Sequence, residues 1–150
     1  VWRTCARLGV PPAAIEDAVQ DVFLTAHRSL HRFEGRSSPL TWLLGITVRV
    51  AANARRTKWK PEVLDEAQPD GSASPEAQLA RRRALAAFER VLSQLPAEQR
   101  EVVVLMDLEQ LSAPEVAEAL SVNLNTIYSR LRLGRAALSR ALQAREELAS

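Results

Sequence analysis

The chain has 150 residues, of which 47% are hydrophobic and 25% charged, and its formal net charge is +2 at pH 7. This composition is globular and excludes an intrinsically disordered chain. The longest purely apolar runs, such as residues 102–106, are far too short to cross a bilayer. A single cysteine, Cys5, excludes an internal disulfide and fits a reducing compartment. We therefore expect a soluble, cytoplasmic protein with no membrane contact of its own.

Charge is distributed unevenly along the chain. Residues 1–60 carry a net charge of +6, residues 61–80 of −5 and residues 81–150 of +1. Within the last part, residues 121–145 contain five arginines and no acid. A surface that is merely solvated mixes both signs more evenly, so these two basic zones predict a polyanionic partner.

The first part of the chain reads as helical. Apolar residues recur every three or four positions from residue 15 to residue 33, after the tandem prolines Pro11 and Pro12, where a helix start tolerates proline. Gly35 ends this pattern, and Ser37 or Ser38 offers an N-cap for a second helix from about residue 40 to residue 56. Its basic last turn suits the C-terminus of a helix.

Residues 61–75 contain three prolines and one glycine without periodicity, which predicts a linker. Helical spacing resumes from residue 76 to residue 95, and Pro96 starts a further short helix. No stretch alternates apolar and polar residues as a strand would. We therefore predict an all-α fold of two small helical domains, residues 1–60 and 76–150, joined by a flexible acidic linker.

The end of the chain has the pattern of a helix-turn-helix. Ser112 and Glu115 form a capping box before a short helix that ends at Leu120, and after a brief turn Asn123 caps a long helix that reaches about Arg145. In such a unit the second helix enters the DNA major groove. A corner of a helical bundle would show the same spacing, but the acid-free arginine face favours DNA.

Particular side chains of this last helix are suited to DNA. Amide, hydroxyl and guanidinium groups can bind base edges, and further arginines can bind phosphates. We expect base-edge contacts from Asn125, Thr126, Tyr128, Ser129 and Arg132. We expect phosphate contacts from Arg130, Arg135 and Arg140.

Residues for catalysis or metal binding are sparse. His27 and His31 have the spacing of a metal pair on a helix, but a site normally needs three or four ligands. There is no glycine-rich phosphate loop, and no serine or cysteine has a base evident from the sequence. We therefore predict a protein that is not an enzyme and that needs no metal or other cofactor.

Two segments together resemble a known family. The first contains Glu16 to Phe23, Arg32-Phe33 and Thr41-Trp42-Leu43, and it resembles region 2 of the sigma-70 family of bacterial RNA polymerase sigma factors. The second, residues 92–120 followed by residues 126–138, resembles region 4. The extracytoplasmic-function group is the most similar. In this order and across such a linker, the two matches are specific and cover most of the chain.

The resemblance implies partners and site residues. The clamp coiled coil in the large subunit of core RNA polymerase is expected to bind Asp17, Gln20, Asp21, Phe23 and Leu24. The minus-ten promoter element is expected to be opened and read by Arg36, Ser37, Ser38, Trp42, Arg49, Asn53, Arg55 and Arg56. Trp42 is expected to be mostly core and to shape that site indirectly. The minus-thirty-five element is expected to contact Asn125, Thr126, Tyr128, Ser129, Arg130, Arg132 and Arg135.

The family pattern also implies an anti-sigma partner and a linker that threads the polymerase, although a solubilising tether explains the linker equally well.

The chain departs from the family pattern at several positions. Gly45 and Arg49 stand where a basic residue and an asparagine are common, and Asn53 stands where aspartate is usual. Ser121 replaces the usual turn glycine, and Leu133 stands where arginine is frequent.

Two other classes of protein remain as alternatives. A stand-alone helix-turn-helix regulator would bind duplex DNA without polymerase, usually as a dimer, but it leaves the segment from Glu16 to Phe23 unexplained. A helical interaction protein without a DNA function leaves the arginine face unexplained. Dependence of promoter binding on core polymerase separates a sigma factor from both.

Overall fold

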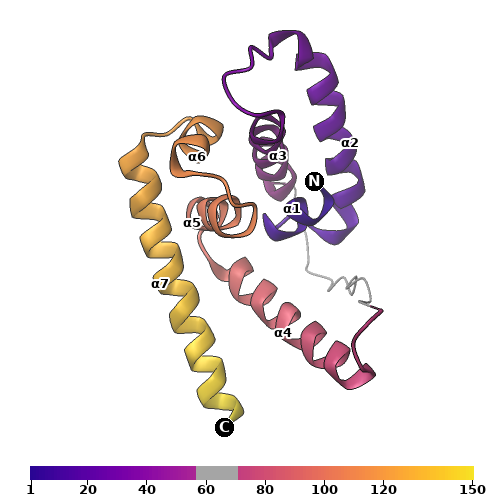
Figure 1. Ribbon diagram of the computed structural model, residues 1–150, viewed down its shortest axis with the longest axis vertical. Coiled ribbons are helices and arrows are strands. Elements are labelled where there is room, and N and C mark those ends of the chain that lie inside the picture. Colours follow the sequence, from indigo (N-terminus) through magenta and orange to yellow (C-terminus); the bar gives the residue numbers. More distant parts are fainter. Residues whose placement is uncertain (57–70) are drawn as a thin grey trace.

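The computed structural model describes residues 1–56 and 71–150, and among them it contains helices and turns but no strand (Figure 1). The N-terminal half consists of α1 (Trp2–Arg7), α2 (Pro12–Ser29), the 3-10 turn η1 (Leu30–Arg32) and α3 (Pro39–Arg56). The C-terminal half consists of α4 (Pro75–Gln94), α5 (Ala97–Val103), the π-helical turn η2 (Val104–Leu108), α6 (Ala113–Leu120) and α7 (Leu124–Ala149). The all-α prediction is confirmed, whereas residues 57–70, with most of the predicted acidic linker, lie outside the described residues.

The predicted helix starts are present because short polar side chains cap them. Ser38 rather than Ser37 accepts the backbone N–H of Thr41 at 3.1 Å. The capping box is complete, with the Ser112 N–H donating to Glu115 at 2.7 Å and the Glu115 N–H donating to the Ser112 hydroxyl at 3.4 Å. The capping signals in the sequence therefore located these boundaries.

Residues 2–7 form the short helix α1, as the resemblance to region 2 implies for the end of a helix before residue 7. Two other features of the helices differ from the prediction. Helix α7 continues to Ala149 rather than ending near Arg145, because its last two turns consist of good helix formers. The chain widens into the π-helical turn η2 directly after α5, a local change of pitch that periodicity does not encode.

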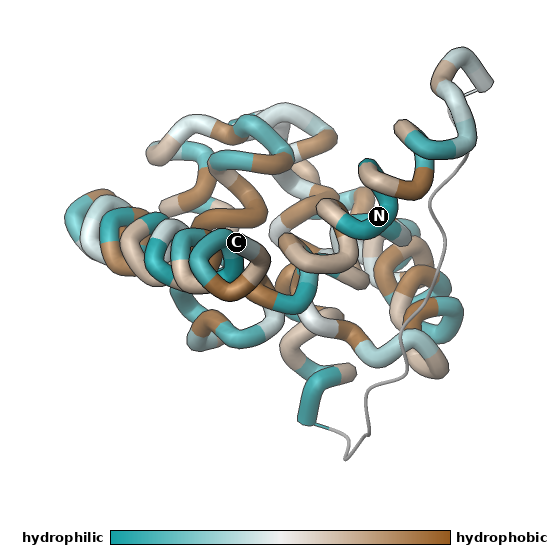
Figure 2. The backbone as a smooth tube through the Cα atoms, turned by 90° about the horizontal axis from the view of Figure 1, so that it is seen from below, coloured by the Kyte–Doolittle hydropathy of each residue, from teal (hydrophilic) through white to brown (hydrophobic). Residues whose placement is uncertain are grey.

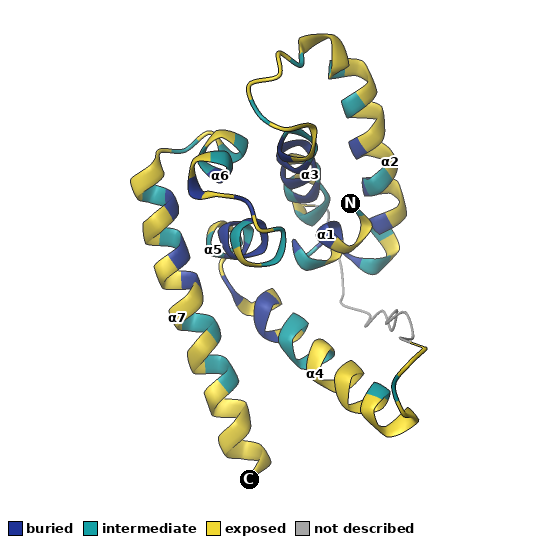
Figure 3. Cartoon of the chain, viewed as in Figure 1, coloured by how far each residue is buried: buried dark blue, intermediate teal, exposed yellow. Residues whose placement is uncertain are grey.

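The apolar faces of the helices meet in a common interior. Figure 2 shows hydrophobic and hydrophilic residues alternating along each helix, as amphipathic spacing requires. Figure 3 shows the buried residues where helices adjoin, whereas the N-terminal part of α4 and the C-terminal part of α7 are exposed. The interior includes Leu8, Ile15, Leu44, Leu92, Val102, Leu105, Val116 and Ile127.

The two halves of the chain also pack against each other, which the sequence did not predict. Helix α3 lies beside α6 (Figure 1), and α1 contacts α4. The core cluster joins residues of both halves, such as Leu44 of α3 and Val116 of α6. Each half is close to the lower size limit for a self-sufficient core, so burial at this contact contributes to the stability of both.

Candidate nucleic-acid and polymerase interface

The outer face of α7 carries four of the residues predicted to contact DNA bases. Asn125, Tyr128, Ser129 and Arg132 are all exposed, and their spacing puts them on one face of the helix. The opposite face is anchored in the core by residues such as Ile127, which is fully buried. The exposed amide, hydroxyl and guanidinium groups are of the kinds that bind base edges in the major groove.

The turn before α7 fixes the direction of that helix. Ser121 adopts the left-handed conformation, with φ 55° and ψ 43°, and the Val122 N–H donates to the Ala117 carbonyl at 3.1 Å. Asn123 then caps α7 by accepting the Thr126 N–H at 2.8 Å and the Thr126 hydroxyl at 3.0 Å. The hydroxyl of Thr126, which we expected at a base edge, is therefore occupied within the helix cap.

Two arginines of α7 that we expected at phosphates contact carboxylates of the same chain. The Arg130 side chain is 22% exposed, and its Nη2 lies 3.5 Å from Oε1 of Glu98. Arg135 donates twice to Asp107, with its Nε 2.9 Å from Oδ2, and this hydrogen bonding raises the pKa of Arg135. These carboxylates therefore compete with DNA phosphates for the two guanidinium groups, each of which keeps further N–H donors.

The polar loop between η1 and α3 borders an open cavity. Its volume is about 290 Å³, and its lining residues are Arg32, Phe33, Glu34, Arg36, Ser37, Trp42 and Glu118. The rings of Phe33 and Trp42 are tilted against each other with their centroids 5.1 Å apart. Trp42 is half-buried and lines the cavity directly, so the expectation that it would act only indirectly is wrong. The charged lining residues are two arginines and two glutamates, and Arg36 pairs with Glu34 at 2.8 Å. An aromatic wall of this kind suits an unstacked base.

One face of α3 continues from this loop and exposes three of the predicted DNA contacts. Arg49, Asn53 and Arg56 are exposed and share helical spacing. The Nε of Arg49 donates to the Gly45 carbonyl at 3.2 Å, which fixes the start of the side chain. This face and the loop cavity together form a polar, basic strip along the N-terminal half.

Arg55 does not belong to this strip. It lies on the same side of α3 as Val48 and Ala51, which are buried. Its guanidinium donates to the Leu8 carbonyl and, at 2.9 Å, to Oε1 of Glu101 in the C-terminal half. Its side chain is 17% exposed. The helical phase of Arg55 therefore makes it a contact between the two halves rather than an exposed DNA contact.

The residues predicted to contact polymerase are exposed on α2. Asp17, Gln20, Asp21 and Leu24 are exposed and share one side of the helix. Phe23 and Leu24 are 53% and 50% exposed, which is unusual for side chains of this size. A surface that combines acids with exposed large apolar groups is typical of a protein contact.

The sequence analysis did not identify two residues of interest, one exposed apolar residue and one acid that joins the two halves. Leu30, the first residue of η1, is 59% exposed although it belongs to the apolar spacing of residues 15–33. Glu118 of α6 lines the loop cavity of the opposite half. Hydrophobicity alone could have marked Leu30, but no local signal indicates Glu118, because its contact joins residues far apart in the chain.

The described residues contain no group of three or more side chains that could hold a metal ion. His27 and His31 are both exposed on the end of α2 and in η1, without a third ligand beside them in the described part of the chain. None of the described helices combines the length and hydrophobicity needed to cross a bilayer.

Comparisons with known proteins agree with this geometry. The family model for sigma-70 region 2 matches residues 1–60, and the model for sigma-70 region 4 matches residues 85–138. The sigma factor NccH of Alcaligenes xylosoxydans xylosoxydans is 30% identical over 90% of this chain and 76% of its own length. The ECF sigma factor SigM of Mycobacterium tuberculosis is 33% identical over 85% of this chain and 63% of its own length.

Solved structures show the same fold. The sigma factor RpoE of Bartonella quintana, in complex with the anti-sigma factor NepR, superposes with a TM-score of 0.75 at 23% identity, over 95% of this chain and 89% of that chain. CnrH, in complex with the cytosolic domain of CnrY, superposes with a TM-score of 0.71 at 26% identity, over 95% of this chain and 80% of that chain.

Two regions in this order, on an all-helical fold with an exposed recognition helix, define a promoter-specificity factor. The chain belongs to the sigma-70 family of bacterial RNA polymerase sigma factors, in the extracytoplasmic-function group. Members of this family are transcription initiation factors that direct polymerase to promoters. The alternative of a stand-alone regulator is not favoured, because the match to region 2 covers the segment that such a regulator leaves unexplained.

Proposed function

We propose that this chain binds core RNA polymerase through α2, opens and reads the minus-ten element with the loop and α3, and reads the minus-thirty-five element with α7. One observation carries the proposal. A chain of this family has two separate surfaces that suit DNA, namely the aromatic loop cavity and the exposed face of α7. Residues 1–60 and 76–150 are the two working units, and residues 61–75 connect them.

Polymerase contact is assigned to α2 because its exposed face is not needed for folding. Asp17, Gln20 and Asp21 offer charge and hydrogen bonds, while Phe23 and Leu24 offer apolar area. Large apolar anchors surrounded by polar groups are the usual centre of a protein interface. The partner surface is expected on the clamp coiled coil of the large subunit.

Minus-ten recognition is assigned to the loop cavity and the exposed strip of α3. A flipped base would stack near Trp42 and Phe33, and the backbone would follow Arg36, Arg49 and Arg56. The remaining residues of this proposed set are Ser37, Ser38 and Asn53. Stacking surfaces beside a basic groove are what single-stranded DNA requires.

Minus-thirty-five recognition is assigned to α7 as a helix in the major groove. Asn125, Tyr128, Ser129 and Arg132 support this because they are exposed together. Arg130 and Arg135 would meet phosphates in competition with Glu98 and Asp107. Base contacts give specificity, while phosphate contacts fix the position of the helix.

The chain acts by binding and not as an enzyme, and its site of action is the cytoplasm, where its proposed polymerase partner works. An anti-sigma factor is a further proposed partner. Support comes from RpoE and CnrH, whose solved structures contain NepR and the cytosolic domain of CnrY.

Run-off transcription tests the proposal directly. Purified core polymerase is assayed on a pool of genomic fragments with the wild-type chain and with the variant Asp17→Lys/Asp21→Lys. The double variant Glu146→Lys/Glu147→Lys makes the same charge change at the exposed end of α7 and serves as the control. We expect specific transcripts from the wild type and the control but not from the α2 variant. Tight duplex binding without polymerase and without transcripts would identify a stand-alone regulator instead.

A further inference from the structure

Leu133 is an apolar side chain on the outer face of α7 that folding does not use. It is 46% exposed, and among the described residues it belongs neither to the core cluster nor to the apolar residues packed against that cluster. A single exposed leucine is ordinary on a protein surface. What distinguishes Leu133 is its position among the side chains that we expect at base edges.

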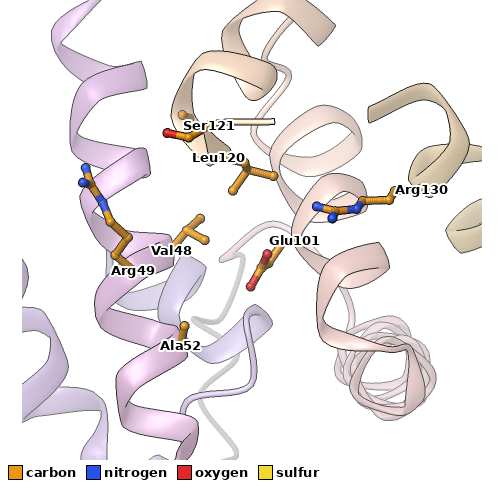
Figure 4. Close-up of a pocket in the computed structure, with 8 residues that line it drawn as sticks. Val48, Arg49, Ala52, Glu101, Leu120, Ser121 and Arg130 are labelled. Atoms are coloured by element: carbon orange, nitrogen blue, oxygen red, sulfur yellow. The ribbon is translucent and has the colours of Figure 1, made fainter. Parts of the chain in front are cut away.

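Packing fixes the rotation of α7 about its axis and so the side on which Leu133 lies. Arg130 extends from α7 towards a cavity of about 210 Å³ that is also lined by residues of α3, α5 and α6 (Figure 4). Gly134, the residue after Leu133, is buried, and an added Cβ there would be 2.8 Å from the Val103 Cγ2 of α5. The Nε of Arg135 donates to Asp107 of η2 at 2.9 Å. Because α7 is tied to α5 and η2 in this way, Leu133 is held at the outer surface.

The neighbours of Leu133 on this side of α7 are polar. Ser129 lies one turn before it and Asn125 two turns before it, so the three residues form a row along the helix. Arg132 is adjacent in sequence, and Asn125, Ser129 and Arg132 are all exposed. No carboxylate stands in this row, since residues 121–145 contain no acid. The leucine therefore continues the row of groups that we expect in the major groove.

An isolated leucine among polar groups fits DNA better than it fits a protein partner. Protein contacts are centred on apolar groups that lie together in a patch. The other large exposed side chains near the start of α7, Leu124 and Tyr128, stand four residues apart in a row of their own and do not extend an apolar patch around Leu133.

The chemistry of the major groove then selects the base. An arginine, which the family pattern frequently has at this position, would bind the O6 and N7 atoms of guanine. Leucine has no donor or acceptor, so opposite a guanine it would bury polar base edges without a partner. Thymine presents an apolar group in the major groove, its 5-methyl group, which a leucine side chain can cover. The leucine therefore favours a different base from the one that an arginine would favour.

We propose that Leu133 is a further specificity-determining residue, which contacts the 5-methyl group of one thymine in the minus-thirty-five element. The inference rests on the proposed function of α7 and adds to it one residue and the base that this residue reads. Burial of a methyl group corresponds to roughly a three- to fourfold change in affinity.

Deoxyuridine tests the proposal, because it differs from thymidine only in lacking the 5-methyl group. The probe is a duplex that carries the strongest promoter found by run-off transcription, and each thymine of its minus-thirty-five element is replaced in turn. Electrophoretic mobility shifts measure its affinity for holoenzyme. With the wild-type chain, we expect one replacement to lower the affinity about three- to fourfold. With Leu133→Ala, the affinity for the unmodified duplex should fall by a similar factor, and the same replacement should have no further effect.

Two further variants sharpen the test. Leu148→Ala removes the same side chain from the end of α7, where Leu148 is 88% exposed and lies about 22 Å along the helix from Leu133. This control should respond to deoxyuridine as the wild type does. Leu133→Arg should lose the response to deoxyuridine and shift the preference at the same base pair towards guanine.

The proposal has clear contrary outcomes. An equal response to deoxyuridine in the wild type and Leu133→Ala would overturn it, as would the lack of a response at every thymine or an element without thymine. Weaker binding of Leu133→Ala to core polymerase, with an unchanged response to deoxyuridine, would make Leu133 a protein contact instead. In all these cases specific transcripts from the wild-type chain would leave the proposed function standing. Their complete absence would overturn the proposed function and this inference together.

Discussion

Gly134 of α7 lies directly against Val103 of α5. A Cβ at Gly134 would stand 2.8 Å from the Val103 Cγ2 and 3.3 Å from the Gln99 carbonyl. The buried glycine thus lets the recognition helix approach α5 closely enough to be anchored by it. The position of the exposed face of α7 depends on this approach.

Gly134→Ala should therefore destabilise the protein, although alanine is the better helix former by about 1 kcal/mol. Overpacking of this contact typically costs about 1–3 kcal/mol, which outweighs the gain in propensity. Urea unfolding followed by circular dichroism measures the change in the free energy of unfolding. In a Val103→Ala background the missing methyl groups leave room, so the same substitution should become neutral or stabilising. A loss of the same size in both backgrounds would contradict the packing explanation.

The turn of the helix-turn-helix stores strain at Ser121. This residue has a φ of 55°, a conformation that is unfavourable for a residue with a Cβ by about 1–2 kcal/mol. Ser121→Gly should raise the free energy of unfolding by about 1 kcal/mol, after the larger entropy loss of glycine is subtracted. Ser121→Ala keeps the Cβ and serves as the control, with little expected change. Chemical denaturation of both variants decides the matter, and equal stability of the two would exclude strain at this turn.

The parts of the fold that could be predicted are those set by residues close together in the sequence. The starts of α3, α6 and α7 follow from capping side chains that act within one turn, at Ser38, Ser112 and Asn123. The contact between Gly45 and Ala119 could not be predicted, because it joins residues that are distant in sequence and carries no periodic signal. The packing of the two halves against each other therefore has no signature in the sequence.

In the candidate site, too, the exposed faces could be predicted from local sequence, whereas contacts between distant residues could not. The exposed faces of α2 and α7 follow from helical spacing, which the sequence displays directly. Arg55 and Arg130 are assigned to DNA by residue type alone, but the structure pairs them with Glu101 and Glu98. Helical phase could have corrected both, since Arg55 lies in phase with buried Ala51 and Arg130 with buried Ile127.

Exposed apolar residues on α2 should matter for polymerase and not for folding. Phe23→Ala and Leu24→Ala remove side chains that are about half exposed, so we expect the free energy of unfolding to change by less than about 0.5 kcal/mol. Affinity for core polymerase should fall by about 1–2 kcal/mol for each variant, as for anchor residues of an interface. Biolayer interferometry with immobilised core polymerase measures this, and Val22→Ala, which alters the buried face, is the contrasting variant. Undiminished affinity in both exposed-face variants would move the polymerase contact elsewhere.

Arg132 and Arg135 should affect promoter binding in different ways. Arg132 is exposed on the outer face of α7, so Arg132→Ala should cost about 1–3 kcal/mol and relax the preference for one base of the minus-thirty-five element. Arg135 is held by Asp107, so Arg135→Ala should weaken binding to all sequences alike. Electrophoretic mobility shifts of holoenzyme on a promoter series distinguish the two patterns. A sequence-dependent loss in Arg135→Ala would place this residue at a base instead.

Removal of the buried guanidinium at position 100 should stabilise the protein. Arg100→Met keeps most of the side-chain volume but removes a charge whose Nε has no acceptor among the described residues. Replacing buried charge by an apolar group of similar size is often stabilising by about 1–4 kcal/mol. We therefore expect a higher free energy of unfolding, measured by urea denaturation. Arg100→Lys keeps the charge and should not show this gain. A lower free energy of unfolding in Arg100→Met would mean that the guanidinium stabilises the fold despite its burial.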